Sequence, residues 1–168
     1  MEIWPVEGPW PGQLAVCSRP RAGWFLDDDL RELHTAGYRV LVSALTPEEV
    51  IRSELERVPI ACEDIGLEFA HFPTGNLQVV HPEHAHPYLL DWHRRLTAGD
   101  GVAVHCWASV GRGPTIASAL MVLGGVELPE AWRRIQEARG REVPDTHQQR
   151  LWALNFNPAE EGSFIADI

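Results

Sequence analysis

Short apolar runs bounded by polar, glycine or proline residues recur along the chain. Four of them lie at residues 14–16, 39–44, 67–72 and 102–104. Runs of this length with few polar members are typical of strands that are buried on both faces, as in parallel sheets. We therefore predict a strand at each of these four positions.

The longer segments between and after these runs carry helix signals. Asp27, Asp28 and Asp29 place acids at the positive end of a helix dipole, and a glycine suited to a helix end follows at position 37. Residues 46–49, Thr-Pro-Glu-Glu, form a capping box with proline at the first helical position, so a helix is expected to follow. Further helices are predicted at residues 82–96, 114–123, 129–138 and 146–154.

The alternation of strands and helices predicts an α/β fold with a mostly parallel central sheet and helices on both faces. We expect a single domain over residues 1–156 and an acidic, frayed tail over residues 157–168. In such folds ligands bind outside the carboxyl ends of the strands. A functional site is therefore expected just after the strand at residues 102–104.

The segment after that strand places a thiol close to a guanidinium. Residues 104–115 read Val-His-Cys-Trp-Ala-Ser-Val-Gly-Arg-Gly-Pro-Thr, so five residues separate Cys106 from Arg112. A tight loop between a strand and a helix aims its amide N–H groups at one point, where they bind an anion and stabilise a thiolate. Arg112 adds a planar donor fork that matches two phosphate oxygens. These features predict a site for phosphate esters.

His105-Cys106-x5-Arg112 resembles the signature of the cysteine-based protein tyrosine and dual-specificity phosphatases. The resemblance implies that Cys106 attacks phosphorus to form a phosphocysteine and that Arg112 holds the equatorial oxygens. It also implies a substrate-binding loop made of His105, Trp107, Ala108, Ser109, Val110, Gly111 and Arg112. It covers residues 14–155 in outline and is specific only at residues 104–115. The alternative is a structural cysteine next to an arginine in a surface ion pair.

The resemblance further implies a general acid, an aspartic acid a few residues after a strand and a Phe-Pro pair. Residues 72–77 read Phe-Pro-Thr-Gly-Asn-Leu, which places Asn76 at the general-acid position. An amide does not donate that proton, and a positioned acid contributes about 10²–10⁴-fold to the rate. Either another residue is the acid, or the pocket mainly binds phosphate. The alternative acids are Glu83, His81, His84 and His86, with Glu48 and Glu49 as more distant options.

Two loop positions depart from the family pattern. Ser109 replaces a glycine, so we expect a backbone conformation there that costs less free energy for glycine than for serine. Gly113 replaces a serine or threonine whose hydroxyl helps the phosphocysteine to break down, which indicates a slower second step. Thr115 is the alternative source of that hydroxyl.

Residues 145–150, Asp-Thr-His-Gln-Gln-Arg, are similar to the glutamine loop of tyrosine phosphatases. This similarity implies that Gln149 positions the water that hydrolyses the intermediate. The alternative is a helix start capped by Thr146 with exposed glutamines. Cys17 and Cys62 are both candidate partners for a protective disulfide with Cys106, as in some relatives.

The charge balance restricts the partners that we expect. The formal net charge is −10, and all fourteen basic residues are arginines. This composition argues against a nucleic-acid surface or an anionic-membrane surface, and it leaves no lysine for a Walker A motif or a covalently bound cofactor. The absence of a signal peptide and of a membrane span, together with an odd cysteine count, favours a cytoplasmic protein, and the arginine bias favours a bacterial source.

The sequence therefore predicts a phosphatase that hydrolyses phosphate monoesters, chiefly phosphotyrosine, with phosphoserine and phosphothreonine as further substrates. A phosphorylated protein or a small phosphate ester is the expected partner, and a phosphate or sulfate ion is expected to bind in the loop. We expect no cofactor and no metal ion, since the histidines at residues 81–86 fit a solvated helix entry. The neutral loop residues disfavour inositol phosphates. The alternatives are a catalytically weak or inactive phosphate-recognition module and a sulfur-transfer or arsenate-reducing protein.

Overall fold

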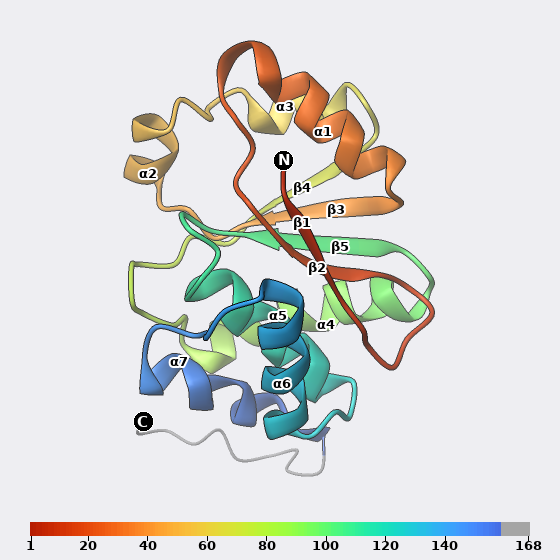
Figure 1. Ribbon diagram of the computed structural model, residues 1–168, viewed down its shortest axis with the longest axis vertical. Helices are drawn as coiled ribbons and strands as arrows, with labels where there is room; N and C mark the ends of the chain where they lie inside the picture. Colours follow the sequence, from red (N-terminus) through yellow and green to blue (C-terminus); the bar gives the residue numbers. More distant parts are fainter. Residues whose placement is uncertain (159–168) are drawn as a thin grey trace.

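The computed structural model describes residues 1–158 as a five-stranded sheet with helices on both faces (Figure 1). The strands are β1 (Ile3–Val6), β2 (Leu14–Cys17), β3 (Tyr38–Ser43), β4 (Glu68–His71) and β5 (Gly101–His105). Their order across the sheet is β1-β2-β5-β3-β4, and every neighbouring pair is parallel except β1 with β2. The predicted α/β class and the mostly parallel sheet are confirmed. Residues 159–168 of the predicted tail lie outside the described part.

The helices form two layers, one on each face of the sheet (Figure 1). One face carries α1 (Leu26–Thr35), α2 (Pro47–Arg52) and α3 (Val58–Glu63). The other carries α4 (Pro82–Thr97), α5 (Arg112–Leu123), α6 (Leu128–Arg139) and α7 (His147–Trp152). Two 3₁₀ turns lie at Gly23–Phe25 and Ala153–Phe156. None of the helices between residues 1 and 158 has the length and apolar character that crossing a membrane requires.

The four predicted strands are confirmed, whereas β1 was not predicted. Pro5 and the glycines that follow it are typical of an irregular segment, so the sequence predicts no strand there. Proline removes a ladder donor and is therefore tolerated mainly in edge strands, and β1 is such an edge strand, paired only with β2. The helix expected after Thr46 is confirmed as α2, which ends at Arg52, whereas the separate helix α3, which begins beside Pro59, was not predicted.

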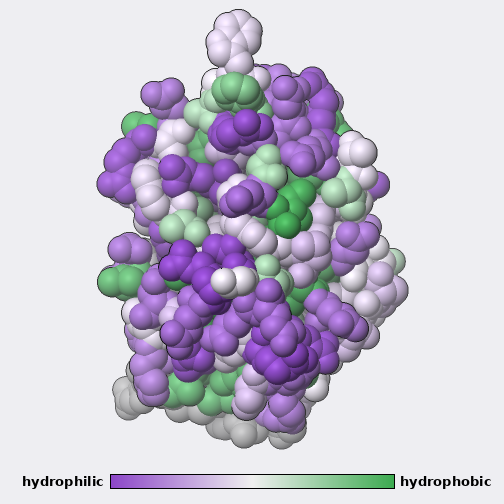
Figure 2. All heavy atoms as spheres, in the orientation of Figure 1, coloured by the Kyte–Doolittle hydropathy of each residue, from purple (hydrophilic) through white to green (hydrophobic). Residues whose placement is uncertain are grey.

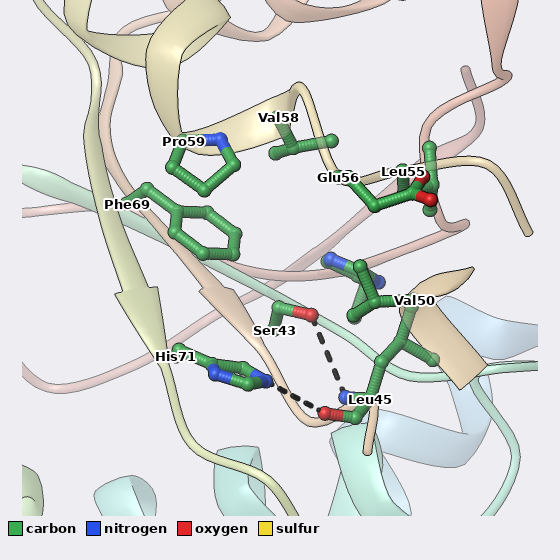
Figure 3. A pocket seen from close by; sticks show the side chains of 10 residues that line it. Ser43, Leu45, Val50, Leu55, Glu56, Val58, Pro59, Phe69 and His71 are labelled. Carbon is green, nitrogen blue, oxygen red and sulfur yellow. Dashed lines mark hydrogen bonds between the residues drawn. The ribbon is translucent and has the colours of Figure 1, made fainter. Parts of the chain in front are cut away.

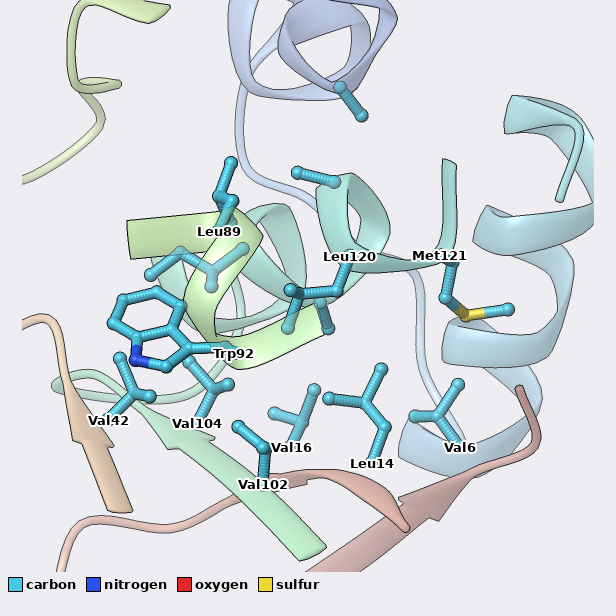
Figure 4. Close-up of a cluster of buried hydrophobic side chains, with 14 of the residues drawn as sticks. Val6, Leu14, Val16, Val42, Leu89, Trp92, Val102, Val104, Leu120 and Met121 are labelled. Atoms are coloured by element: carbon cyan, nitrogen blue, oxygen red, sulfur yellow. The ribbon is translucent and has the colours of Figure 1, made fainter. Parts of the chain in front are cut away.

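Helix α5 is central in the layer that α4, α5, α6 and α7 form (Figure 1). Its residues from Arg112 to Val122 are all buried, as expected for a helix that is apolar on nearly every side. Figure 4 shows Leu120 of this helix facing Leu14 and Val16 of the sheet and Met121 facing Val6, whereas the indole of Trp92 lies near Val42 and Val104. This packing fixes the start of α5 against the end of β5.

The carboxyl ends of the parallel strands meet at one edge of the sheet. Ser43 is paired with His105 on one side and with His71 on the other, and Val16 is paired with Val104. The loops that leave β2, β3, β4 and β5 therefore begin side by side. The segment from Cys106 to Gly111 lies among them, between β5 and α5.

Candidate active site

The predicted strand, loop and helix around the cysteine are present. Cys106 follows β5 directly, and Arg112 is the first residue of α5. Both are nearly buried, with 2% of Cys106 and 3% of Arg112 exposed. The amides of the loop between them lie at the N-terminal end of a twelve-residue helix, where the helix dipole also favours an anion.

Ser109 holds the loop against its neighbours. Its φ is +53°, the left-handed conformation that the glycine in the family pattern indicated. Its hydroxyl donates a hydrogen bond to the carbonyl of Cys17 at the end of β2. Its own carbonyl accepts a hydrogen bond from Nε of Arg139 at 2.8 Å. These contacts oppose the cost of a positive φ in a residue with a side chain.

Arg112 is fixed by a bidentate ion pair with Glu49 of α2. Nη1 and Nη2 lie 2.6 and 2.9 Å from the two carboxylate oxygens of Glu49. Nη1 also donates to the carbonyls of Thr74 at 2.8 Å and of Ala44 at 3.2 Å. The alternative of a surface ion pair is therefore wrong, because the guanidinium is buried and bound by three separate segments.

Glu49 supports Arg112 as an anionic partner and does not fit the role of a distant acid. Burial opposes its charge, but the hydrogen bonds from Arg112 and the amide of Thr46 outweigh burial, so the pKa of the carboxyl is lowered. Burial likewise opposes the charge of Arg112, and the bond to Glu49 outweighs it and raises the pKa of the guanidinium. The capping box at Thr46 identified the helix from sequence, but it gave no sign of this long-range pairing.

His105 is buried behind the loop in a neutral state. It is 1% exposed, its Nδ1 lies 3.4 Å from the carbonyl oxygen of Cys106, and its Nε2 has no hydrogen-bond partner among residues 1–158. Burial first, and nearby arginines next, lower its pKa to about 4. A cavity of about 90 Å³ adjoins it, into which Val50, Val58 and Phe69 point (Figure 3).

The loop after β4 carries Asn76, which is not an acid, at the position where the family pattern places the general acid. Asn76 is exposed within it, while the carbonyl of Thr74 in the same loop binds Arg112. His81, Glu83 and His84 are exposed at the beginning of α4, where the two imidazole rings lie 5.6 Å apart. His86, one turn further along the helix, lies 6.1 Å from the ring of Phe156. No group of metal-binding residues occurs within residues 1–158.

Gln149 and Asp145 both lie against the loop at Gly111. An added Cβ on Gly111 would clash with Oδ2 of Asp145 and would be 3.0 Å from the side-chain amide of Gln149. Gln149 is buried, takes part in the capping box with Thr146, and donates to the carbonyl of Gln78 at 3.4 Å. The helix start capped by Thr146 is confirmed, but this glutamine is not exposed. The sequence did not predict that Asp145 lies beside this loop. The signal that could have indicated it is an acidic residue between Pro144 and the N-cap residue Thr146.

The hydroxyl that the family places after the arginine is absent at Gly113. A Cβ on Gly113 would lie 3.8 Å from Sγ of Cys106, so a serine there would reach the thiol. The hydroxyl of Thr115, the alternative, donates instead to the carbonyl of Gly111 at 2.9 Å. Thr115 therefore stabilises the loop backbone.

The other two cysteines occupy different places relative to Cys106. Cys17 is buried at the end of β2, and burial, with a smaller contribution from Cys106, raises its pKa. Cys62 lies on α3, and burial raises its pKa to about 12. All three thiols are free, and Cys17 is the one whose backbone is bonded to the loop.

Arginines surround the side of the loop formed by Trp107 and Ala108. The guanidinium of Arg19 lies 4.1 Å and that of Arg52 4.3 Å from the centre of the Trp107 ring. Arg19 also donates to the carbonyl of Trp107 at 2.7 Å. The ring is therefore held by two cations, which argues against stacking on an aromatic substrate.

A groove of about 840 Å³ begins at this side of the loop. It is lined by Trp107, Ala108, Trp4, Glu2 and the arginines at positions 19, 21, 139 and 141, with smaller residues between them. Strongly hydrophilic side chains gather over the adjacent end of α6 (Figure 2). The groove thus concentrates positive charge on a protein whose net charge is −10.

We expect Glu49→Gln to lower the free energy of unfolding by about 3 kcal/mol, because it leaves the buried charge of Arg112 without its counter-ion. Urea denaturation at neutral pH measures this change. The neighbouring exposed Glu48→Gln is the control and should alter stability by less than about 0.5 kcal/mol. Equal effects of the two substitutions would contradict the structural role of the ion pair.

We also expect the neutral, buried His105 to make stability depend on pH. Its folded pKa is about 4, whereas an ordinary histidine titrates near 6.5. As the pH falls through 6.5, the unfolded chain gains a proton that the folded chain does not bind, so stability is lost between pH 6.5 and about 4. Urea denaturation of His105→Asn across this range should show a shallower loss than wild type. The exposed His84→Asn should follow wild type, and a parallel curve for His105→Asn would refute the assignment.

Comparison with known proteins supports the same architecture. No protein-family model matches the sequence, and no curated protein matches it. Among solved structures, kinase associated phosphatase is similar with a TM-score of 0.83 at 15% identity, over 93% of each chain. The active form of Tk-PTP has a TM-score of 0.68 at 24% identity, over 85% of this chain and 89% of the other. A protein tyrosine phosphatase from Leishmania major has a TM-score of 0.72 at 18% identity, over 91% and 97%. This chain has the fold of the cysteine-based protein tyrosine and dual-specificity phosphatases.

Proposed function

We propose that this protein is a phosphatase that hydrolyses phosphate monoesters through a phosphocysteine on Cys106. The observation that carries the proposal is the combination of a thiol at the base of an anion-binding loop with a guanidinium held rigidly beside it. Arg112 is oriented by both oxygens of Glu49 and by two carbonyls. These contacts hold the guanidinium at one position beside the Cys106 thiol, where its planar donor fork suits two oxygens of a phosphate.

In the proposed reaction the loop amides and Arg112 bind the phosphate oxygens, and Sγ of Cys106 attacks phosphorus as the ester bond breaks. Holding the phosphate in line with the thiolate removes much of the entropic cost of the step. The fixed N–H groups stabilise the charge that builds up on the equatorial oxygens. Water then attacks phosphorus, the P–S bond breaks and the thiolate is restored. Gln149, beside Gly111, is proposed to help place this water.

A second candidate is a phosphate-recognition module that binds phosphorylated partners without turnover. Two observations favour it. Asn76 stands at the expected position of the general acid, and Gly113 lacks the hydroxyl near Cys106. Both candidates require phosphate to bind in the loop, so only the kinetics of the bound ester separate them.

We expect para-nitrophenyl phosphate to give a burst of nitrophenol followed by steady turnover, since phosphocysteine forms before it hydrolyses. Both phases should disappear in Cys106→Ser and persist in Cys62→Ser, in which the replaced thiol lies on α3. Stopped-flow absorbance measures the burst, and calorimetric titration with phosphate tests binding. Phosphate binding with neither a burst nor steady turnover in wild type would refute the enzyme and favour the recognition module.

The arginine groove indicates the charge of the substrate. A neighbour in the fold comparison, PTPMT1, was solved in complex with PI(5)P, a ligand with several negative groups. In this chain Arg19, Arg139 and Arg141 lie outside the neutral loop and line the groove, with one acid, Glu2, among the lining residues. We propose that the groove binds acidic side chains that flank a phosphotyrosine, because it is lined by arginines and its volume of about 840 Å³ exceeds what a single small ester would fill.

We expect a phosphotyrosine peptide with flanking glutamates to have a lower KM than the same peptide with alanines. Arg141→Gln should raise the KM of the acidic peptide roughly twofold to fivefold, as for an exposed charge pair. It should leave the KM of the alanine peptide unchanged, and the exposed Arg94→Gln on α4 is the matched control. A larger loss on a short-chain phosphatidylinositol phosphate than on the acidic peptide would overturn the peptide assignment in favour of the lipid.

A further inference from the structure

The carboxylate of Asp145 lies at the rim of the anion-binding loop. Its Oδ2 occupies the space into which a side chain at position 111 would project, so that an added Cβ on Gly111 would clash with it. Gly111 immediately precedes Arg112, so the carboxylate is adjacent to the part of the loop that ends in the phosphate-binding guanidinium. Asp145 is exposed, and a bound ester can therefore reach it.

The chain on both sides of Asp145 is anchored. Val143 is fully buried, and its carbonyl accepts hydrogen bonds from Gln136 at 2.8 Å and from Arg150 at 3.2 Å. Pro144 then restricts the backbone dihedral. On the other side Thr146 begins α7 with a complete capping box. These two anchors fix the backbone of Asp145 beside the loop and so restrict the region that its carboxylate can occupy, which keeps the carboxylate within reach of a bound ester.

The other carboxylates and imidazoles near the loop are less suitable. Glu49 is committed to Arg112 as its counter-ion. Asn76 has no acidic proton, and the imidazoles of His81 and His84 lie near one another at the entrance to α4. Asp145, in contrast, has no ion pair or hydrogen bond to its carboxylate described within residues 1–158 and directly abuts the loop.

We propose that Asp145 is the proton donor and acceptor of this site, in place of the residue missing at Asn76. The inference rests on the proposed phosphatase function. In the first step Sγ of Cys106 bonds to phosphorus, the P–O ester bond breaks, and the carboxyl of Asp145 gives its proton to the departing oxygen. In the second step a water oxygen bonds to phosphorus, its proton passes to the Asp145 carboxylate, and the P–S bond breaks to restore the thiolate. The acid used in the first step is thereby regenerated.

The test compares two aryl phosphates whose leaving groups differ in basicity. Para-nitrophenolate leaves without much help, whereas phenolate needs a proton as the bond breaks. We expect Asp145→Asn to lower kcat/KM for phenyl phosphate by about 10²-fold or more and for para-nitrophenyl phosphate by a much smaller factor. Asp145→Glu, which keeps a carboxyl, should recover part of the loss on phenyl phosphate. Glu142→Gln, an exposed carboxylate in the same segment, is the matched control and should behave as wild type.

The outcomes separate this inference from the function on which it rests. Equal losses on both esters in Asp145→Asn would assign a structural role and overturn the proton transfer, and so would the absence of any loss. In either case turnover that depends on Cys106 in wild type would leave the phosphatase function intact. A wild type without such turnover would refute both. The thermal midpoint and the phosphate affinity of each variant show whether the loop is still folded.

Discussion

The buried ion pair between Arg112 and Glu49 is the interaction on which the site depends. A guanidinium that is taken out of water needs a counter-ion and acceptors for its remaining donors. Here the acceptors come from α2, from the turn after β3 and from the loop after β4. The hydrogen bonds of this one side chain thus join three segments, all distant in sequence from β5, to the end of that strand.

The parallel sheet makes this convergence possible. Three of its crossovers return each strand in the same direction, so the segments that leave β2, β3, β4 and β5 share one edge. The apolar helix α5 fixes the C-terminal end of the loop, because almost all residues of this helix are buried. The loop itself is tied to β2 through the Ser109 hydroxyl and to α6 through Arg139. Its shape follows from contacts on every side rather than from its own sequence.

Local patterns were enough to predict most of the fold and the centre of the site. The short apolar runs located four strands, and the spacing of Cys106 and Arg112 located the loop, because each signal lies within a few adjacent residues. β1 was missed because its pairing with β2 outweighs a composition that suggests an irregular segment. The ion pair of Glu49 with Arg112 and the position of Asp145 beside Gly111 were hidden for a different reason: each is a contact with residues far away in the sequence. Such contacts arise only when the chain has folded.

The arginines of the groove have a consequence for the electric field around the site. A guanidinium stays protonated throughout the range in which proteins are folded, and this chain contains no lysine. The charge of these guanidinium groups is therefore constant with pH, whereas dissolved salt screens the attraction that they exert. At physiological ionic strength the screening length is about 8 Å, so the groove attracts anions that have already come near the loop. At longer distances the net charge of −10 on the whole protein repels the same anions. Attraction therefore begins only when an anion is close to the groove.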